Sequence, residues 1–195
     1  MKNIVFDLGG VVFWRDPRKC SPELIDFFSF VRLPEMPHFW NEYDRGTRTL
    51  DQVLHDLEER SGRDRDYCRE MVRQAIDCQE AIRPTERLIE ELHAAGYRLY
   101  VLSNMSREFI DFLRRQPVYR HFDGEVVSCE EGHCKPEEAI YRLLLDRYGL
   151  EGSETLFIDD RRENVAAAEQ VGIHGFWFDR RDEQAACQTL RQHLL

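Results

Sequence analysis

The chain opens with Lys2-Asn3-Ile4-Val5-Phe6-Asp7-Leu8-Gly9-Gly10-Val11-Val12. The apolar run in this segment predicts a buried strand, which ends on one carboxylate and then turns on two glycines. Ligands of open parallel sheets bind outside the carboxyl ends of the strands. We therefore expect the Asp7 side chain to take part in chemistry at that edge of a sheet.

Two later apolar runs also end on polar side chains. These side chains are Ser103 and Asn104 after the first run, and Asp159 and Asp160 after the second. Lys135 lies between the two runs, directly before a proline that suits the first turn of a helix. Each motif alone is weak, because such residues also suit helix caps or ordinary surface positions. Four such segments in this order are a specific signal.

The four segments resemble the motifs of the haloacid dehalogenase-like (HAD) hydrolase superfamily. The matching residues are Asp7, Ser103, Lys135 and the pair Asp159 and Asp160. The chain looks like the branch of glucose-1-phosphate phosphatase-like proteins. This resemblance implies an α/β fold, in which helices flank a Rossmann-like parallel sheet core and a small helical cap is inserted after the first strand.

The resemblance implies phosphatase chemistry, which the residue types also support. A carboxylate is able to attack phosphorus and form an acyl phosphate, so Asp7 is the expected nucleophile. Mg²⁺ prefers oxygen ligands, and the expected ones are Asp7, Asp159, Asp160 and the backbone oxygen of Gly9. We therefore predict a Mg²⁺-dependent phosphatase that works through an aspartyl-phosphate intermediate.

The phosphate group of the substrate needs hydrogen-bonding and cationic partners. Ser103 and Asn104 are able to donate hydrogen bonds to its oxygens. Lys135 supplies a positive charge that offsets the negative charge of the site, so it is both a catalytic and a phosphate-binding candidate. The expected substrate is a small phosphorylated metabolite, with sugar phosphates as the leading class.

Gly9 departs from the pattern of the superfamily phosphatases. They usually carry a second Asp, the general acid, two positions after the nucleophile, and here that position is Gly9. General acid catalysis is typically worth about 10²- to 10⁴-fold in rate. The missing acid predicts either a slow enzyme or a substrate with a good leaving group, such as a sugar 1-phosphate. Asp16 is a candidate substitute, although a lone Asp usually lies solvated in a surface loop.

Two other functions stay open at this point. Haloalkanoic acid dehalogenases of the superfamily also lack the second Asp and work without a metal. Against that alternative, the chain keeps the Asp159 and Asp160 pair, which has no role in a metal-free site. The other alternative is a catalytically weakened HAD-fold binding protein. Dependence of activity on Mg²⁺ separates the three functions.

The order of the predicted elements divides the chain into two parts. Strand and helix patterns alternate after residue 83, which is typical of a parallel sheet with crossover helices. Before that point the pattern is helical. The helical stretches are residues 22–30, 50–60 and 64–78. We therefore predict an α/β core of residues 1–13 and 83–195 and a helical cap of residues 14–82.

The cap is expected to select the substrate, because the motif residues contact only the transferred phosphate. Its aromatic and basic candidates are Trp14, Phe39, Trp40, Tyr43, Arg45 and Arg48. Large aromatic side chains usually serve packing, so we assign the adjacent pair Phe39 and Trp40 to the cap core. Arg45 is the favoured substrate contact, because residues 44–46 predict an exposed turn. Trp14 and Tyr43 are further candidates.

Composition excludes several classes of partner. The chain has 27 basic and 37 acidic residues, a net charge of −10, which argues against nucleic acid as a partner. No apolar stretch reaches the roughly 20 residues that span a membrane. The six cysteines form no Cys-x-x-Cys pair, so we predict reduced thiols in a cytoplasmic protein. Cys129, His133 and Cys134 are interpreted as incidental loop residues.

Overall fold

A five-stranded sheet forms the centre of the computed structural model, which describes residues 1–33 and 35–195. The strands lie in the order β5-β4-β1-β6-β7. Their bounds are β1 Asn3–Phe6, β4 Arg98–Ser103, β5 Gly124–Val127, β6 Thr155–Asp159 and β7 His174–Trp177. All neighbouring strands of this sheet are parallel, so their carboxyl ends meet at one edge.

Helices connect the strands of the sheet and cover it. They are α5 Arg83–Ala94, α6 Arg107–Leu113, α7 Ser128–Glu131, α8 Glu138–Tyr148, α9 Arg162–Gln170 and α10 Glu183–Leu194, with 3-10 helices at Pro117–His121 and Gly152–Glu154. Among the described residues, no helix has the length and apolar character needed to cross a membrane.

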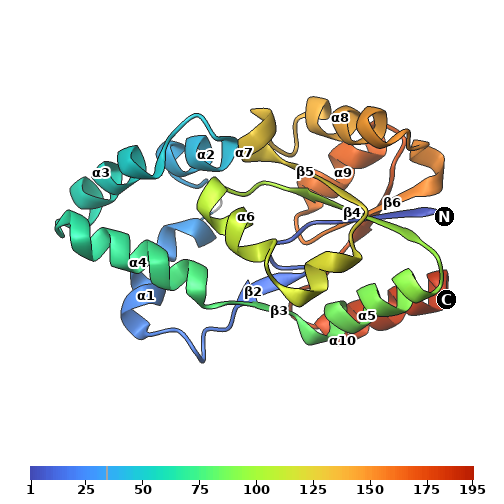
Figure 1. Ribbon diagram of the computed structural model, residues 1–195, viewed down its shortest axis with the longest axis horizontal. Coiled ribbons are helices and arrows are strands. Elements are labelled where there is room, and N and C mark those ends of the chain that lie inside the picture. The colour runs from blue at the N-terminus through green and yellow to red at the C-terminus, as the bar shows by residue number, and fades with distance from the viewer. Residues whose placement is uncertain (34) are drawn as a thin grey trace.

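Both faces of the sheet are buried. On β1, Ile4 and Phe6 belong to one hydrophobic cluster and Val5 belongs to another, because successive side chains of a strand point to opposite faces. Helices α5 and α10 pack on the first face, and α8 and α9 pack on the second (Figure 1). The predicted fold class, a Rossmann-like parallel sheet flanked by helices, is confirmed.

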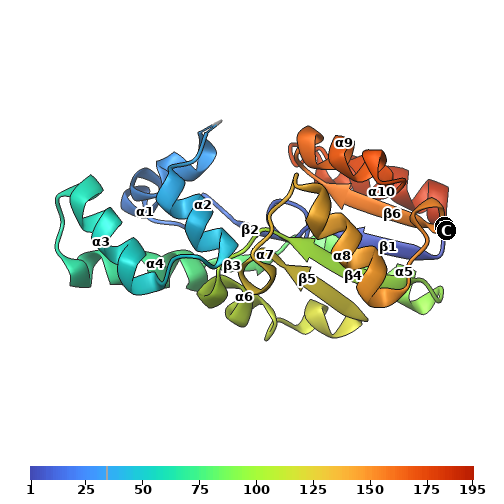
Figure 2. The same ribbon diagram turned by 90° about the horizontal axis from the view of Figure 1, so that it is seen from above.

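Four further helices lie together on one side of the sheet domain (Figure 2). They are α1 Pro22–Phe27, α2 His38–Arg45, α3 Leu50–Ser61 and α4 Arg65–Asp77, with a 3-10 helix at Ser29–Arg32. We call α1 to α4 the cap helices. Side chains of Ser21, Thr49 and Asp64 accept hydrogen bonds from first-turn backbone N–H groups, which explains where three of these helices begin.

The cap helices bury a hydrophobic cluster of their own. Its centre includes Trp40, Leu54 and Met71, and Phe109 of α6 also belongs to it. The prediction that Phe39 and Trp40 serve packing is confirmed, since Trp40 is buried in this cluster and Phe39 packs against it. Both chain termini lie at the far end of the sheet domain from the cap helices (Figure 1).

The prediction that the cap segment is purely helical is wrong at its two ends. Strands β2 Phe13–Arg15 and β3 Gln79–Ala81 pair antiparallel and form a two-stranded ribbon. Each strand has three residues, which is too short to show an alternating pattern. The chain enters the cap helices through β2 and leaves them through β3. The two segments that connect the cap helices to the sheet domain therefore lie side by side.

Three helix predictions also need correction. Helices α2 and α7 were not predicted, because α2 has only eight residues and no side-chain cap at its start, and α7 has only four residues. The helix predicted to begin at Pro136 begins instead at Glu138. Lys135 and Pro136 lie in the loop before this helix, so the Lys135 backbone is not helical.

Candidate active site

Three parallel strands deliver three polar side chains to one edge of the sheet. Asp7 directly follows β1, while Ser103 and Asp159 are the last residues of the neighbouring strands β4 and β6. The Ser103 hydroxyl donates a hydrogen bond to Asp7 Oδ1 over 3.0 Å. All three side chains are buried, and Asp7 keeps 7% exposure at the surface of the site. The sheet register thus brings Asp7 into contact with Ser103, which lies 96 positions later in the sequence.

Lys135 reaches this cluster from the loop before α8. Its Nζ lies 2.8 Å from Asp7 Oδ1 and 2.7 Å from Asp159 Oδ2, and its side chain is 1% exposed. Asn104 holds the loop in place, because its side chain donates to Lys135 O and accepts from Lys135 N. The predicted site residues Asp7, Ser103, Asn104 and Lys135 therefore form one connected group.

The electrostatics of the site follow from burial and crowded negative charge. Burial raises the pKa of Asp7 to about 7; Lys135 opposes this shift, and the Asp159 and Asp160 carboxylates add to it. Burial lowers the pKa of Lys135, but the Asp159 and Asp7 carboxylates more than offset this, so its pKa is raised overall. Lys135 is the buried cation that faces these three carboxyl groups, which leaves an excess of negative charge inside the cluster.

Three carboxylates of this cluster are able to hold a metal ion. One oxygen each from Asp7, Asp159 and Asp160 lies within 4.8 Å of the others, and this is the one such group of His, Cys, Asp and Glu side chains found among the described residues. Asp159 is saturated by Lys135, Asn164 and the Arg161 N–H. Its oxygens thus already have partners, whereas Asp7 and Asp160 have more capacity left to hold a metal ion.

Two glycines shape the site in different ways. Gly10 has φ +83°, and a Cβ there would lie 2.8 Å from Asp160 Oδ2, so the close approach of the Asp160 carboxylate requires glycine. A Cβ at Gly9 would meet nothing within 4 Å. The position at which the superfamily phosphatases carry the second Asp is therefore open space.

Several supporting residues were not predicted from the sequence. Asn164 Nδ2 donates to both Asp159 oxygens, over 3.1 and 3.0 Å. Trp177 Nε1 donates to Asp160 O, and the Arg180 guanidinium lies 3.3 Å from Asp160 Oδ2. Asn164 could have been predicted from the sequence, because it lies about one helical turn after the paired carboxylates Asp159 and Asp160. Trp177 ends strand β7 and Arg180 follows it, and neither residue has such a relation to the motifs.

A large cavity opens beside the buried cluster, between the cap helices and the sheet domain. It has a volume of about 730 Å³. Its lining residues are Glu35, Met36, His38, Asn41, Glu42, Asp44, Arg45, Asn104, Cys134, Lys135, Pro136, Glu137, Arg161 and Glu163. Asn104 and Lys135 connect it to the Asp7 cluster, and most of the lining side chains are polar or charged.

The structure separates the three substrate candidates of the cap. Arg45 lines the cavity, but it lies in the last turn of α2, so the predicted exposed turn is wrong. Tyr43 is 2% exposed within the cap cluster, and its hydroxyl donates to Glu108 of α6. Trp14 is half-buried in strand β2. Neither Tyr43 nor Trp14 is among the residues that line the cavity.

Arg45 and Arg48 already have carboxylate partners. The Arg45 guanidinium pairs with Glu137 and donates to Gly132 O, which ties α2 to the loop before α8. Arg48 pairs with Glu42 and Asp56, both within the cap helices. Arg45 therefore contributes to the contact between the two parts of the molecule as well as to the cavity wall.

Asp16 does not have the environment of a general acid. Its side chain is 3% exposed, so the prediction of a solvated loop position is wrong. The guanidinium of Arg18 forms hydrogen bonds to both of its oxygens, and these bonds hold the pKa of Asp16 below its ordinary value. A carboxyl group that stays ionised has no proton to donate at neutral pH.

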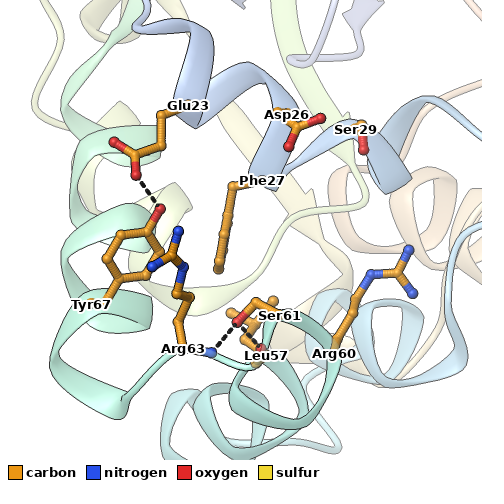
Figure 3. A pocket seen from close by; sticks show the side chains of 9 residues that line it. All are labelled: Glu23, Asp26, Phe27, Ser29, Leu57, Arg60, Ser61, Arg63 and Tyr67. Atoms are coloured by element: carbon orange, nitrogen blue, oxygen red, sulfur yellow. Dashed lines mark hydrogen bonds between the residues drawn. The ribbon is translucent and has the colours of Figure 1, made fainter.

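A second cavity lies wholly among the cap helices (Figure 3). It has a volume of about 330 Å³. Tyr67 and Glu23 are hydrogen-bonded across one side, and the Phe27 ring projects into it (Figure 3). None of its lining residues belongs to the Asp7 cluster. This second cavity therefore has no access to the candidate chemistry, in contrast to the cavity beside Lys135.

A parallel α/β sheet that presents an acidic cluster and one buried lysine at its carboxyl edge defines a hydrolase of the HAD class. The haloacid dehalogenase-like hydrolase family matches residues 1–172, and the chain belongs to this family. The match includes every residue of the Asp7 cluster. The resemblance predicted from the four motifs is thereby confirmed, and the protein is a hydrolase.

Several relatives are phosphatases. The chain is 31% identical to the sesquiterpene phosphatase astK of Aspergillus oryzae, covering 98% of this chain and 95% of that protein. It is 25% identical to the D-ribitol-5-phosphate phosphatase of Bacteroides thetaiotaomicron, over 90% and 91% of the two chains. Its fold is similar to that of an HAD family enzyme from the same bacterium in complex with magnesium and inorganic phosphate. That structure matches with a TM-score of 0.72 and 22% identity, covering 91% of this chain and 93% of the other.

Proposed function

We propose that the protein is a Mg²⁺-dependent phosphatase of small phosphorylated metabolites. Asp7 is the nucleophile, and the observation that carries the proposal is its placement within 3.0 Å of both Ser103 Oγ and Lys135 Nζ. In the first step an Asp7 oxygen attacks phosphorus and the bond to the leaving oxygen breaks, which gives an aspartyl phosphate. Water then releases phosphate and restores Asp7. Ser103, Asn104 and Lys135 stabilise the phosphoryl oxygens.

The residues present fit a magnesium ion. Burial and two neighbouring carboxylates hold the pKa of Asp7 near 7, so a second cation is needed to keep the nucleophile ionised beside a phosphate dianion. Asp7 and Asp160 would hold the ion, with the backbone oxygen of Gly9 as a further ligand and Asp159 behind them. A bound Mg²⁺ supplies Lewis-acid stabilisation of the phosphoryl oxygens.

The cavity favours a hydroxyl-rich leaving group. Its wall carries several carboxylates together with His38, Asn41 and Arg45, which suit the hydroxyls of a sugar or polyol phosphate. The D-ribitol-5-phosphate phosphatase relative acts on such a compound by name, whereas the astK relative is named for a sesquiterpene. A polar wall binds a terpenyl chain poorly, so sugar and polyol phosphates are the leading class.

A cytoplasmic location stays a prediction from composition.

The test is phosphate release from a panel of sugar, polyol, aryl and terpenyl phosphates, with Mg²⁺ and with chelator. Asp7→Asn should lower turnover by about 10³-fold or more, because the amide is not a nucleophile for phosphorus. Asp66→Asn is the matched control, since Asp66 is 94% exposed on α4 and should leave turnover unchanged. Mg²⁺-independent release, or release that survives Asp7→Asn, would contradict the proposal.

A metal-free dehalogenase is the second candidate. Gly9 favours it, because that class also lacks the second acidic residue. The cluster of Asp7, Asp159 and Asp160 argues against it, since three carboxylates around one buried lysine suit a metal ion better than a metal-free site. Halide release from 2-haloacids in the presence of chelator would favour this candidate.

A further inference from the structure

We propose that Asp44 of the cap helices donates the leaving-group proton that Gly9 is unable to supply. This inference rests on the proposed phosphatase reaction and names the acid of its first step. It requires a carboxyl group that faces the cavity beside the phosphate-binding residues. It also requires that this group carry a proton at neutral pH.

The position of Asp44 meets the first requirement. Asp44 lies in the last turn of α2, is half-buried, and lines the 730 Å³ cavity together with Asn104 and Lys135. A neighbouring cavity of about 160 Å³ is lined by Asp44 and Asn104 as well. The Asp44 carboxyl accepts a hydrogen bond from the Ser106 N–H, two residues after Asn104. Its carboxyl group is thus held beside the loop that binds the transferred phosphate.

Contacts with the sheet domain fix the end of α2 that carries Asp44. The Ser128 hydroxyl donates to the Asp44 backbone oxygen and accepts from the Met105 N–H. Gly46 ends the helix with φ +82°, and a Cβ there would collide with the Cys129 backbone. These contacts hold the Asp44 backbone against α7 and, through Ser128, beside the loop after β4, so its carboxyl group has a defined place relative to Asn104.

No charged partner holds Asp44 in its ionised form. Among the side chains that the structure describes, none makes a salt bridge to its carboxyl group, in contrast to Glu42 and Glu137 of the same cavity. The adjacent Arg45 is bound to Glu137, and Lys135 is bound to the Asp7 cluster. Arg45 and Lys135 are therefore committed to other carboxylates, and the guanidinium of Arg15, which lines the 160 Å³ cavity with Asp44, lies over the Phe28 ring.

Three further titratable groups near Asp44 are neutral. They are the thiols of Cys129 and Cys134 and the phenol of Tyr43, and burial raises the pKa of each. Burial also raises the pKa of Asp44 to about 8, opposed only by the hydrogen bond from Ser106. Asp44 is therefore mainly protonated at pH 7, which meets the second requirement.

The proton balance of the reaction is then complete. An Asp7 oxygen bonds to phosphorus, the bond between phosphorus and the leaving oxygen breaks, and that oxygen takes the proton of Asp44. In the second step water attacks the phosphorus of the aspartyl phosphate, the bond from phosphorus to Asp7 breaks, and the water proton passes to Asp44. Each turnover regenerates Asp7 as a carboxylate and Asp44 as an acid.

The test compares two leaving groups in Asp44→Asn. With glycerol 3-phosphate, whose alkoxide needs a proton, kcat/KM should fall about 10²- to 10³-fold. With 4-nitrophenyl phosphate, whose phenolate leaves without one, it should change by less than about threefold, because acid catalysis contributes little there. Asp66→Asn is the matched control in the same cap helices, and it should leave both rates unchanged.

Each outcome has one meaning. If a folded Asp44→Asn variant loses both activities equally, or neither, the inference is overturned while the phosphatase stands. If the native protein releases no phosphate from any substrate, the proposed function itself fails. Should the variant not fold, the native protein decides through a series of leaving groups. A shallow dependence of rate on leaving-group pKa supports an acid, and a steep dependence overturns it.

Discussion

The buried cluster around Asp7 and the cavity wall formed by the cap helices hold their charges in different ways. In the cluster, Lys135 is 1% exposed and bonds to two carboxylates at once. In the cavity wall, Arg45 and Glu137 are 34% and 40% exposed and form one ion pair. Buried charges are costly to leave unpaired, whereas half-exposed pairs exchange easily with water. The difference suits a fixed centre for phosphoryl transfer beside an adaptable surface for the leaving group.

Removal of the buried Lys135 should give the largest loss of stability. It tests whether the buried cluster around Asp7 holds its charges in fixed pairs. Lys135→Met leaves the Asp7 and Asp159 carboxylates without their cation, so we expect a loss of about 3 kcal/mol or more in unfolding free energy in chelator. Mg²⁺ should restore part of the loss. Urea unfolding measures both. Lys2→Met is the control, because Lys2 is 67% exposed and its pair with Glu154 should contribute less than about 1 kcal/mol. Equal losses in the two variants would break the comparison.

An acid at Gly9 is the next largest change and asks whether the cap has taken over a role of the core. In the Asp44→Asn background, Gly9→Asp should raise hydrolysis of glycerol 3-phosphate by about 10-fold or more, since the new side chain enters open space beside Asp7. Steady-state kinetics measure the rescue. Gly10→Asp is the control. Its φ of +83° and the proximity of Asp160 Oδ2 forbid the side chain, so it should lose stability and activity. Rescue by neither variant would remove the assigned role of position 9.

The two regions also differ in how far the sequence predicted them. Asp7, Ser103 and Asp159 each end an apolar run, and parallel pairing of those runs is enough to bring them together. Lys135 was predicted as a site residue because it lies between the second and the fourth motif in the sequence. Local patterns were sufficient for the core because each strand carries its own signal.

The cavity wall depends on contacts between segments that are far apart in sequence. Asp44 is a site candidate only because α2 packs beside α7 and the loop after Asn104, and no local pattern reports that packing. Tyr43 was predicted as a substrate contact and instead packs in the cap cluster, since the helix that carries it was not recognised. Such errors are expected where segments that are far apart in the sequence pack against each other.

The pH dependence of Mg²⁺ binding tests whether the pKa of Asp7 in the buried cluster is raised. Because Asp7 has a pKa of about 7, mainly raised by burial, a proton competes with Mg²⁺ for its carboxylate below that pH. Apparent Mg²⁺ affinity should rise about tenfold between pH 6 and 8 and then level off. Isothermal titration at a series of pH values measures the affinity. The dependence should be absent in Asp7→Asn, and an equal dependence in that variant would assign the proton to another group.

The same raised pKa predicts the stability of the metal-free protein. The folded state binds this proton more tightly than the unfolded chain, so its contribution is fully present near pH 4 and is lost as the pH rises through about 7. The melting temperature in chelator should therefore fall across this range more steeply for the native protein than for Asp7→Asn. Saturating Mg²⁺ should reduce the difference, because the metal takes the place of the proton.

The ion pair between Arg45 and Glu137 should give the smallest effect, and it tests the adaptable side of the comparison. A double-mutant cycle of Arg45→Gln and Glu137→Gln should yield a coupling below about 1 kcal/mol in unfolding free energy, because both groups are more than a third exposed. The kinetic effect should fall on KM for sugar phosphates, since the pair lines the cavity, while kcat stays within about threefold if chemistry is confined to the buried cluster. A coupling as large as that of the buried lysine would show that α2 is locked to the core by charge. In that case the cavity wall would be as rigid as the centre it serves, and the division between fixed chemistry and adaptable recognition would not hold.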